Sequence, residues 1–223
     1  MGEWCYPHVP RYRVPFLKGL NWTMTWVKVC GLRRERDVAA ALEAGADAVG
    51  FVLAAQSPRR VTESRAWALA QDLPMLSVIV TADLTPDELM AAVAATGVGG
   101  VQPHGHHQRD AAAAAQQEGL FVLYPVSMRG PVDLSEVSEG QTPLLDTYRA
   151  GVHGGTGEPF DWELIPDHGR PYVLAGGLGP DNIEEAIRQA APWGVDASSG
   201  LESSPGVKDP DRIREFVERV RAR

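Results

Sequence analysis

A cysteine and then a glycine end a short alternating run, VKVCGL, at residues 27–32. Alternation of this kind predicts a β-strand. A thiol at the carboxyl end of a strand has two interpretations: a small, inert core residue, or a group that faces a cavity and acts as a base or nucleophile. Strand position alone leaves both open for Cys30.

Polar residues end several later apolar runs as well. A core has little use for polar side chains at so many strand ends, and in a barrel the carboxyl ends of the strands meet at one mouth. We therefore expect these residues to share a site with the thiol. They are Gln102 and His104 at the fourth predicted strand, Asp146 at the sixth and Asp196 in the eighth.

Three glycine-rich stretches follow the sixth, seventh and eighth predicted strands. Glycine frees backbone N–H groups for an anion, and barrels often bind phosphate between their last loops, at the start of a short extra helix. Any one such loop is more simply a tight turn, but three at one mouth favour a phosphate site. The candidate phosphate-binding residues are Gly155, Gly157, Gly176, Gly177, Ser198, Ser199 and Gly200.

The elements that must position these residues alternate regularly from residue 26 to the end. Eight strand–helix units in about 200 residues match a small, single-domain (β/α)₈ or TIM barrel of the α/β class. A doubly wound open sheet is the competing architecture, but no glycine-rich dinucleotide motif follows the first strand. The predicted strands span 26–30, 47–53, 75–80, 99–102, 120–124, 143–146, 171–175 and 194–198.

Helices are expected between these strands. One begins at Pro86 behind a capping box formed by Thr85 and Glu88, and another opens on Pro180. The remaining helices are expected at 34–44, 62–72, 108–118, 132–137, 161–165 and 210–221.

The barrel domain is expected to span residues 24–223, behind an N-terminal extension of residues 1–23. The extension contains three prolines and shows neither helical nor strand periodicity. We expect it to be weakly ordered. Its aromatic residues, among them Trp4 and Trp22, leave an alternative in which it packs on the barrel or on a partner.

Composition excludes several classes of function. The chain has 223 residues, 44% hydrophobic and 22% charged, with a formal net charge of −8. This balance disfavours nucleic acid or an anionic membrane surface as a partner, and no run approaches the ~18 apolar residues of a membrane helix. Cys5 and Cys30 are the only cysteines. A reducing cytoplasm is therefore the simpler location, with one disulfide as the alternative.

The chain from Val27 onward resembles the phosphoribosylanthranilate isomerase family of tryptophan biosynthesis. Each motif alone is modest, but the ordered set is specific. The motifs are VKVCGL at 27–32, GADAVGFVL at 45–53, SPR at 57–59, VQPHG at 101–105, LLD at 144–146, GGTG at 154–157, FDW at 160–162, LAGGL at 174–178, VDASSGLE at 195–202 and PGVKD at 205–209.

The resemblance implies an Amadori rearrangement that uses neither cofactor nor metal. N-(5′-phosphoribosyl)anthranilate would become 1-(2-carboxyphenylamino)-1-deoxyribulose 5-phosphate in a monomer or homodimer. Cys30 would act as general base and Asp146 as general acid. A cysteine is mostly protonated at neutral pH, so nearby positive charge or oriented amides must favour its thiolate. A simple helix cap remains the alternative for Asp146.

The same resemblance implies roles in substrate binding. Arg59 would face the anthranilate carboxylate, for which a planar fork of donors is suited, whereas Arg60 is interpreted as a surface charge. Asp196 would contact a substrate hydroxyl or support the scaffold. Gln102 and His104 would line the pocket in roles that the sequence does not separate.

Some positions depart from the family pattern or suggest another function. Proline stands at position 103, and strand five runs into Tyr124 and Pro125. The run HGHH at 104–107 suggests a metal, but no acidic or thiol partner has ligand spacing. The rival functions are a histidine-pathway isomerase, whose paired aspartates do not match Cys30, and a non-catalytic phosphosugar-binding barrel.

Overall fold

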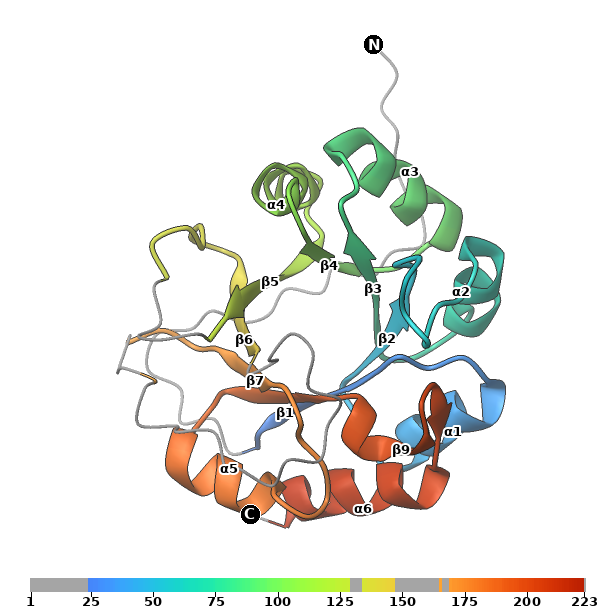
Figure 1. The fold of residues 1–223 in the computed structure, drawn as a ribbon, viewed down its shortest axis with the longest axis vertical. Helices are drawn as coiled ribbons and strands as arrows, with labels where there is room; N and C mark the ends of the chain where they lie inside the picture. Colours follow the sequence, from blue (N-terminus) through green and yellow to red (C-terminus); the bar gives the residue numbers. More distant parts are fainter. Residues whose placement is uncertain (1–23, 129–133, 147–164, 166–168, 223) are drawn as a thin grey trace.

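Eight parallel strands close into a barrel in sequence order, with the helices outside it (Figure 1). The computed structural model describes residues 24–128, 134–146, 165 and 169–222. Each strand pairs with the next, and β8 pairs with β1 to close the ring. The expected (β/α)₈ barrel is confirmed. The N-terminal extension and most of the helix expected at 161–165 lie outside the described residues.

The strand positions agree with the sequence pattern to within a few residues. The barrel strands are β1 Trp26–Cys30, β2 Ala48–Val52, β3 Leu76–Ala82, β4 Gly100–His104, β5 Phe121–Ser127, β6 Thr142–Asp146, β7 Val173–Ala175 and β8 Gly194–Ala197. After β8 come a 3₁₀ helix, η2, over Ser199–Leu201 and a two-stranded hairpin of β9, Glu202–Ser204, and β10, Val207–Lys208. The hairpin was not expected from the sequence.

The helices of the described chain surround the strands. They are α1 Glu35–Glu43, α2 Glu63–Ala70, α3 Pro86–Thr96, α4 Gln108–Gln117, α5 Ile183–Ala190 and α6 Pro210–Arg221. The capping box predicted for α3 is present: the Thr85 hydroxyl accepts from the Glu88 amide, and the Glu88 carboxylate accepts from the Thr85 amide. Such a box satisfies two amides that a helix start would otherwise leave unpaired.

Two helix predictions need correction. Residues 134–137 form a turn, closed by the Val137 amide donating to the Leu134 carbonyl at 3.0 Å, instead of the end of a helix over 132–137. The helix expected from Pro180 begins only at Ile183. Before it, the Asn182 side chain accepts from the Gly179 amide and donates to the Gly177 carbonyl, which folds this segment into a turn.

Glycines in the strands make room for large side chains inside the barrel. A Cβ on Gly100 would lie 3.1 Å from a Val78 methyl carbon, and one on Gly194 would lie 2.9 Å from the Trp26 ring. Side chains two residues apart on a strand face the same side. Trp26, Lys28 and Cys30 therefore all point inward from β1, and the barrel is filled rather than hollow.

Two prolines, Pro103 on β4 and Pro125 on β5, lie beyond the point where the hydrogen bonding between these strands stops. Their register ends at Val101 with Val122, although β4 continues beside β3 to His104. Backbone groups alternate between the two sides of a parallel strand. Because the Phe121 amide bonds the Gly99 carbonyl, the nitrogens of Pro103 and Pro125 both face this gap and neither can donate. The Gln108 side chain donates to the Pro125 carbonyl at 2.7 Å instead.

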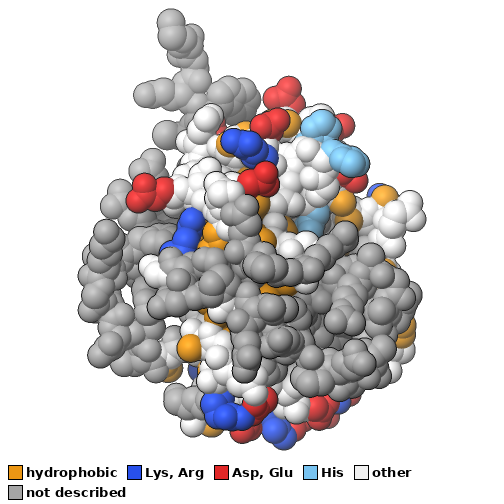
Figure 2. Space-filling model, turned by 60° about the vertical axis from the view of Figure 1, so that its left-hand side comes forward, with side chains coloured by type: hydrophobic (Ala, Val, Ile, Leu, Met, Phe, Trp, Pro, Cys, Tyr) orange, Lys and Arg blue, Asp and Glu red, His pale blue; other side chains and the backbone are white. Residues whose placement is uncertain are grey.

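The described surface carries charges of both signs. On the face drawn in Figure 2, acidic and basic side chains are interspersed among the described residues, so the net charge of −8 does not gather there in one patch. Within the described part of the chain, no helix is long and apolar enough to cross a membrane.

Candidate active site

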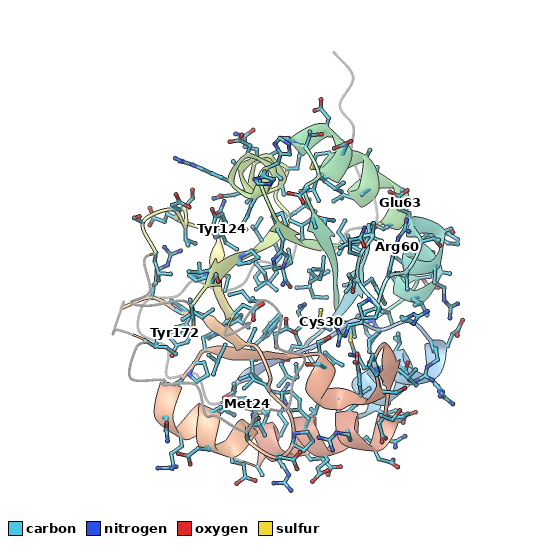
Figure 3. All side chains as sticks on the ribbon, viewed as in Figure 1. Met24, Cys30, Arg60, Glu63, Tyr124 and Tyr172 are labelled. Atoms are coloured by element: carbon cyan, nitrogen blue, oxygen red, sulfur yellow. The ribbon has the colours of Figure 1, made fainter. Side chains whose placement is uncertain are left out.

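Cys30 lies inside the ring of strands, whereas Arg60 lies beside α2 at the surface (Figure 3). The cysteine side chain is 6% exposed and packs with Val52 and Val80 at the carboxyl ends of β2 and β3. It is therefore buried at the mouth of the barrel, where a barrel active site is expected.

The glycine after Cys30 is required by its neighbours. Gly31 has φ +79°, in the left-handed region that favours glycine. A Cβ at this position would lie 2.7 Å from Arg59 Cδ and 3.1 Å from Ser198 Oγ. Ser198 Oγ also donates to the Cys30 carbonyl at 3.1 Å. The chain turns sharply here, so that parts of β1, the loop after β2 and the end of β8 meet.

A buried lysine links the polar residues of β1, β4 and β8. Lys28 is fully buried, and its Nζ lies 2.7 Å from Asp196 Oδ2 and 2.9 Å from Gln102 Oε1. An ammonium group only donates, so the Gln102 amide must turn its NH₂ toward His104 Nε2, at 3.1 Å. The His104 ring therefore accepts at Nε2 and carries its proton on Nδ1.

The charges of this cluster shift the pKa values of its members. Burial, and then the positive charge of Lys28, lower the pKa of His104 to about 4, so this ring is neutral at pH 7. Burial disfavours the charged form of Lys28, but the ion pair with Asp196 and the interaction with Cys30 outweigh it and raise the lysine pKa. Lys28 is therefore a permanent cation.

The thiol itself is held in its protonated form in this structure. Burial raises the pKa of Cys30, and Asp196 acts in the same direction. The positive charges of Lys28 and Lys208 oppose this shift without overcoming it. The positive charge that the sequence interpretation requires is present, but burial of the sulfur outweighs it.

A second ion cluster lies at the same mouth and was not predicted. Arg59 Nε and Nη2 lie 2.7 and 2.8 Å from the two Glu202 carboxylate oxygens. Lys208 Nζ lies 2.7 Å from Glu202 Oε1 and 2.9 Å from the Ser198 carbonyl. Burial lowers the pKa of Lys208, although Glu202 opposes the shift. The hairpin of β9 and β10 thus brings Glu202 to Arg59, and Lys208 binds the same carboxylate.

Asp146 ends β6 on the inward side. It is two residues beyond Leu144, which belongs to the apolar cluster inside the barrel, so both side chains face the interior. In the register, Asp146 pairs with Ala175 and Ala175 with Asp196. The side chain is half-buried. The loop that it would cap begins outside the described residues, so the alternative capping role stays a prediction.

The loops after β7 and β8 touch each other. Gly176 and Gly177 have φ of +92° and +66°. A Cβ on Gly200 would lie 2.1 Å from the Leu178 carbonyl oxygen, so only glycine fits there. Ser199 begins η2 and is exposed. The structure thus brings together five of the seven predicted phosphate-binding residues, while Gly155 and Gly157 lie outside the described part.

Known proteins match this chain over nearly the whole barrel. The sequence model of the N-(5′-phosphoribosyl)anthranilate isomerase family matches residues 27–219. The chain belongs to this family. The family's isomerase from Chromohalobacter salexigens is 43% identical over 203 residues, covering 88% of this chain and 94% of that protein. The isomerase from Rubrobacter xylanophilus is 41% identical over 201 residues, covering 87% and 98%.

Solved structures of phosphoribosylanthranilate isomerases share the fold. The Thermus thermophilus enzyme aligns with a TM-score of 0.78 at 32% identity, covering 88% of this chain and 98% of that one. Another family member, solved with reduced 1-(o-carboxyphenylamino)-1-deoxyribulose 5-phosphate, aligns with a TM-score of 0.75 at 30% identity over the same shares. The resemblance stated from the sequence motifs is thereby confirmed.

Sequence reasoning missed three members of this isomerase site. A lysine in an otherwise apolar strand was the available signal for Lys28. Glu202 and Lys208 stood within quoted motifs, but nothing in the sequence indicated that Glu202 binds both Arg59 and Lys208. Among the described residues, no group of three His, Cys, Asp or Glu side chains could hold a metal ion, and His106 and His107 are exposed before α4.

Proposed function

We propose that this phosphoribosylanthranilate isomerase uses Cys30 as its general base and Asp146 as its general acid. The protein is an aldose–ketose isomerase of tryptophan biosynthesis that converts N-(5′-phosphoribosyl)anthranilate to 1-(2-carboxyphenylamino)-1-deoxyribulose 5-phosphate. The single observation that supports these roles best is the placement of a thiol and a carboxyl group, 116 positions apart in sequence, on the inward side of one barrel mouth.

The reaction needs a proton delivered and a proton removed. Asp146 delivers its proton to the ribose ring oxygen, which breaks the C1′–O bond and leaves a protonated imine (iminium ion). Cys30, as thiolate, then takes the proton from C2′, and the electron pair forms the enamine that becomes the ketose. General acid–base catalysis of this kind contributes about 10²- to 10⁴-fold to a rate.

The anthranilate carboxylate would bind the free edge of Arg59. A guanidinium group has two edges that can each take a carboxylate in a bidentate manner. Glu202 occupies the edge formed by Nε and Nη2, which leaves the edge at Nη1. Glu202 would thereby fix the orientation of the Arg59 guanidinium group while the anthranilate carboxylate binds its other edge.

Asp196 would accept a hydrogen bond from a ribose hydroxyl. Its Oδ2 holds Lys28, but its buried Oδ1 has no partner in the described structure. A buried acceptor without a partner costs about 1–3 kcal/mol, so a substrate donor there would be favoured. Gln102 and His104 would line the pocket beside it.

The phosphate would bind between the loops after β7 and β8. Gly176 and Gly177 take left-handed backbone conformations in the loop after β7, and Gly200 allows this loop to touch the loop after β8. The site would be completed by residues from the loop after β6, where Gly155 and Gly157 were expected.

The cellular location and the oligomeric state are also part of the proposal. We expect a cytoplasmic enzyme because a chain with two cysteines and a biosynthetic role suits a reducing compartment. A monomer and a homodimer are both compatible with the fold. A solved relative from Thermotoga maritima is described as monomers generated from a dimeric isomerase.

Steady-state kinetics test the proposed roles. The fluorescence of N-(5′-phosphoribosyl)anthranilate should decay when purified protein is added. Cys30→Ser and Asp146→Asn should each lower kcat by at least about 10²-fold with an unchanged melting curve. Cys5→Ser, which alters the other cysteine, is the matched control and should keep full activity. If both site variants stayed within tenfold of the parent, these roles would be wrong although the reaction would stand.

A further inference from the structure

Lys28 is a fully charged side chain in the interior of the barrel, and the acid–base steps do not use it. Its side chain is 0% exposed and is among the largest that are completely buried. Burying a cation costs several kcal/mol unless it is paired and hydrogen-bonded. A neutral residue of similar size would fill the same volume at lower cost, so the charge itself needs an explanation.

The contacts of Lys28 hold its side chain beside the sulfur. Asp196 and Gln102 fix its Nζ at 2.7 and 2.9 Å, and Cys30 lies two residues further on the same inward face. Lys28 and Cys30 both lie next to Gly50. A Cβ added to Gly50 would lie 2.8 Å from Cys30 Sγ and 3.2 Å from Lys28 Cε. The lysine and the cysteine share the space that this glycine leaves.

Among the described residues, the ion pairs nearest Cys30 contain more cations than carboxylates. Three cations, Lys28, Arg59 and Lys208, bind two carboxylates, Asp196 and Glu202. The partners from β4 are neutral, since Gln102 has no charge and His104 is unprotonated at pH 7. In these ion pairs the cations outnumber the carboxylates by one before a substrate carboxylate binds Arg59.

We propose that Lys28 is a positioning residue that stabilises the thiolate of Cys30 during the reaction, with Asp196 acting on the same thiolate in the opposite sense. This inference rests on the proposed function, in which Cys30 is the base. The lysine keeps its three protons throughout. When the C2′ proton moves to the sulfur, the thiolate charge is lost and Lys28 remains paired with Asp196.

Opposite effects of two neighbouring charges distinguish this role from a merely structural one. Removing the cation in Lys28→Met should disfavour the thiolate, and removing the anion in Asp196→Asn should favour it. A charge within about 4–6 Å shifts a pKa by about 1–3 units, which is about 10- to 10³-fold in thiolate at a pH well below the midpoint. Loss of packing alone would not produce changes of opposite sign.

The rate of Cys30 alkylation by iodoacetamide measures the thiolate directly. The full chain carrying Cys5→Ser is the parent, so that Cys30 is its sole thiol, and intact mass reports the reaction at about pH 7. Relative to this parent, Lys28→Met should react at least about tenfold more slowly and Asp196→Asn at least about tenfold faster. The double variant should fall between them, and thermal melts check the fold.

The outcomes separate this inference from the proposed function. Shifts of the same sign, or single variants that both stay within threefold of the parent, would overturn the role of Lys28. If Lys28→Met failed to fold, Asp196→Asn should still react faster, and the double variant should react more slowly than Asp196→Asn. Wild-type turnover of the fluorescent substrate is measured separately, so its absence would count against the proposed function and leave the alkylation result intact.

Discussion

At the scale of single residues, the site is defined by a few charged groups in a dry interior. Lys28 fixes the orientation of the Gln102 amide, and that amide fixes the proton of His104 on Nδ1. The donor and acceptor roles along this chain of contacts are fixed, because an ammonium group can donate hydrogen bonds but cannot accept them. A neutral His104 at pH 7 follows, and it makes the stability of the protein depend on pH.

Stability should fall as the pH decreases from about 6.5 to 4. The pKa of His104 is about 4 in the folded protein and about 6.5 when unfolded, so the unfolded chain binds more protons between these values. The histidine contributes its full stability above pH 6.5 and loses roughly 2–3 kcal/mol on acidification to pH 4.5. Urea unfolding at pH 7 and pH 4.5 measures this loss.

Variants assign the loss to its residue. His104→Gln should lose less stability than wild type on acidification, by about the same 2–3 kcal/mol. His106→Gln is the matched control, because that exposed side chain lies two residues away, and it should behave as wild type. Equal acid sensitivity in all three proteins would show that His104 is not responsible.

The sequence predicted candidate residues better than their partners. Cys30, Gln102, Asp146 and Asp196 could be proposed because each polar residue ends or nearly ends an apolar strand. Lys28 lies inside a strand, so position alone did not mark it. Its role depends on Asp196, 168 residues away, and such a pairing is not visible in one sequence.

At the scale of elements, the site depends on glycines that leave space between neighbouring strands and loops. Gly50 on β2 leaves the volume that Lys28 and Cys30 fill from β1. Gly200 lets the loop after β8 touch the loop after β7. These glycines are therefore part of the site although they carry no functional group.

A methyl group on Gly50 should damage catalysis more than stability alone explains. Its carbon would lie 2.8 Å from Cys30 Sγ and 3.2 Å from Cys30 Cα, so the cysteine must move. Overpacking of this kind costs about 1–3 kcal/mol, and we expect kcat of Gly50→Ala to fall at least about 10²-fold, since small misplacements are costly in catalysis. Kinetics and urea unfolding of the same sample measure both effects.

A second glycine inside the barrel provides the control. A Cβ on Gly100 would press on Val78 at 3.1 Å and on the Phe121 carbonyl at 3.2 Å, away from the cysteine. Gly100→Ala should lose similar stability yet keep kcat within about threefold. If both variants lost activity in parallel with stability, the space beside Cys30 would have no special role.

Element prediction failed where the signal is local and weak. The hairpin of β9 and β10 has strands of three and two residues, too short for any periodicity. It nevertheless carries Glu202, which binds Arg59, and Lys208, which binds Glu202. The start of α5 was placed at Pro180 by a general preference, and the side chain of Asn182 overrides it by folding a turn first.

At the scale of the whole molecule, the barrel was predictable because its signal repeats. Eight apolar runs at regular spacing, each followed by a helix or loop, leave few architectures. The pairing of β8 with β1 was expected from the count of eight strand–helix units, since the sequence of neither strand indicates it. The repeated pattern does not predict which loops contact each other, and those contacts determine the geometry of the active site.

The barrel should function without the N-terminal extension. The family match begins at residue 27, and the first strand at Trp26. A chain of residues 24–223 should keep turnover within about twofold and its Tm within about 4 °C, equivalent to roughly 1 kcal/mol for a domain of this size. Calorimetry and the fluorescence assay check both values, with the full chain as control. A larger loss would favour the alternative in which residues 1–23 pack on the barrel.

A crystal structure of this protein with reduced 1-(o-carboxyphenylamino)-1-deoxyribulose 5-phosphate, the compound bound to one relative, tests the central claim most directly. We predict that Cys30 Sγ and the Asp146 carboxylate lie on opposite sides of the sugar chain, each within about 3.5 Å of it, as proton transfer requires. The phosphate should contact the amides of the loops after β7 and β8. A ligand whose sugar carbons lie far from Cys30, or whose phosphate binds elsewhere, would contradict this account.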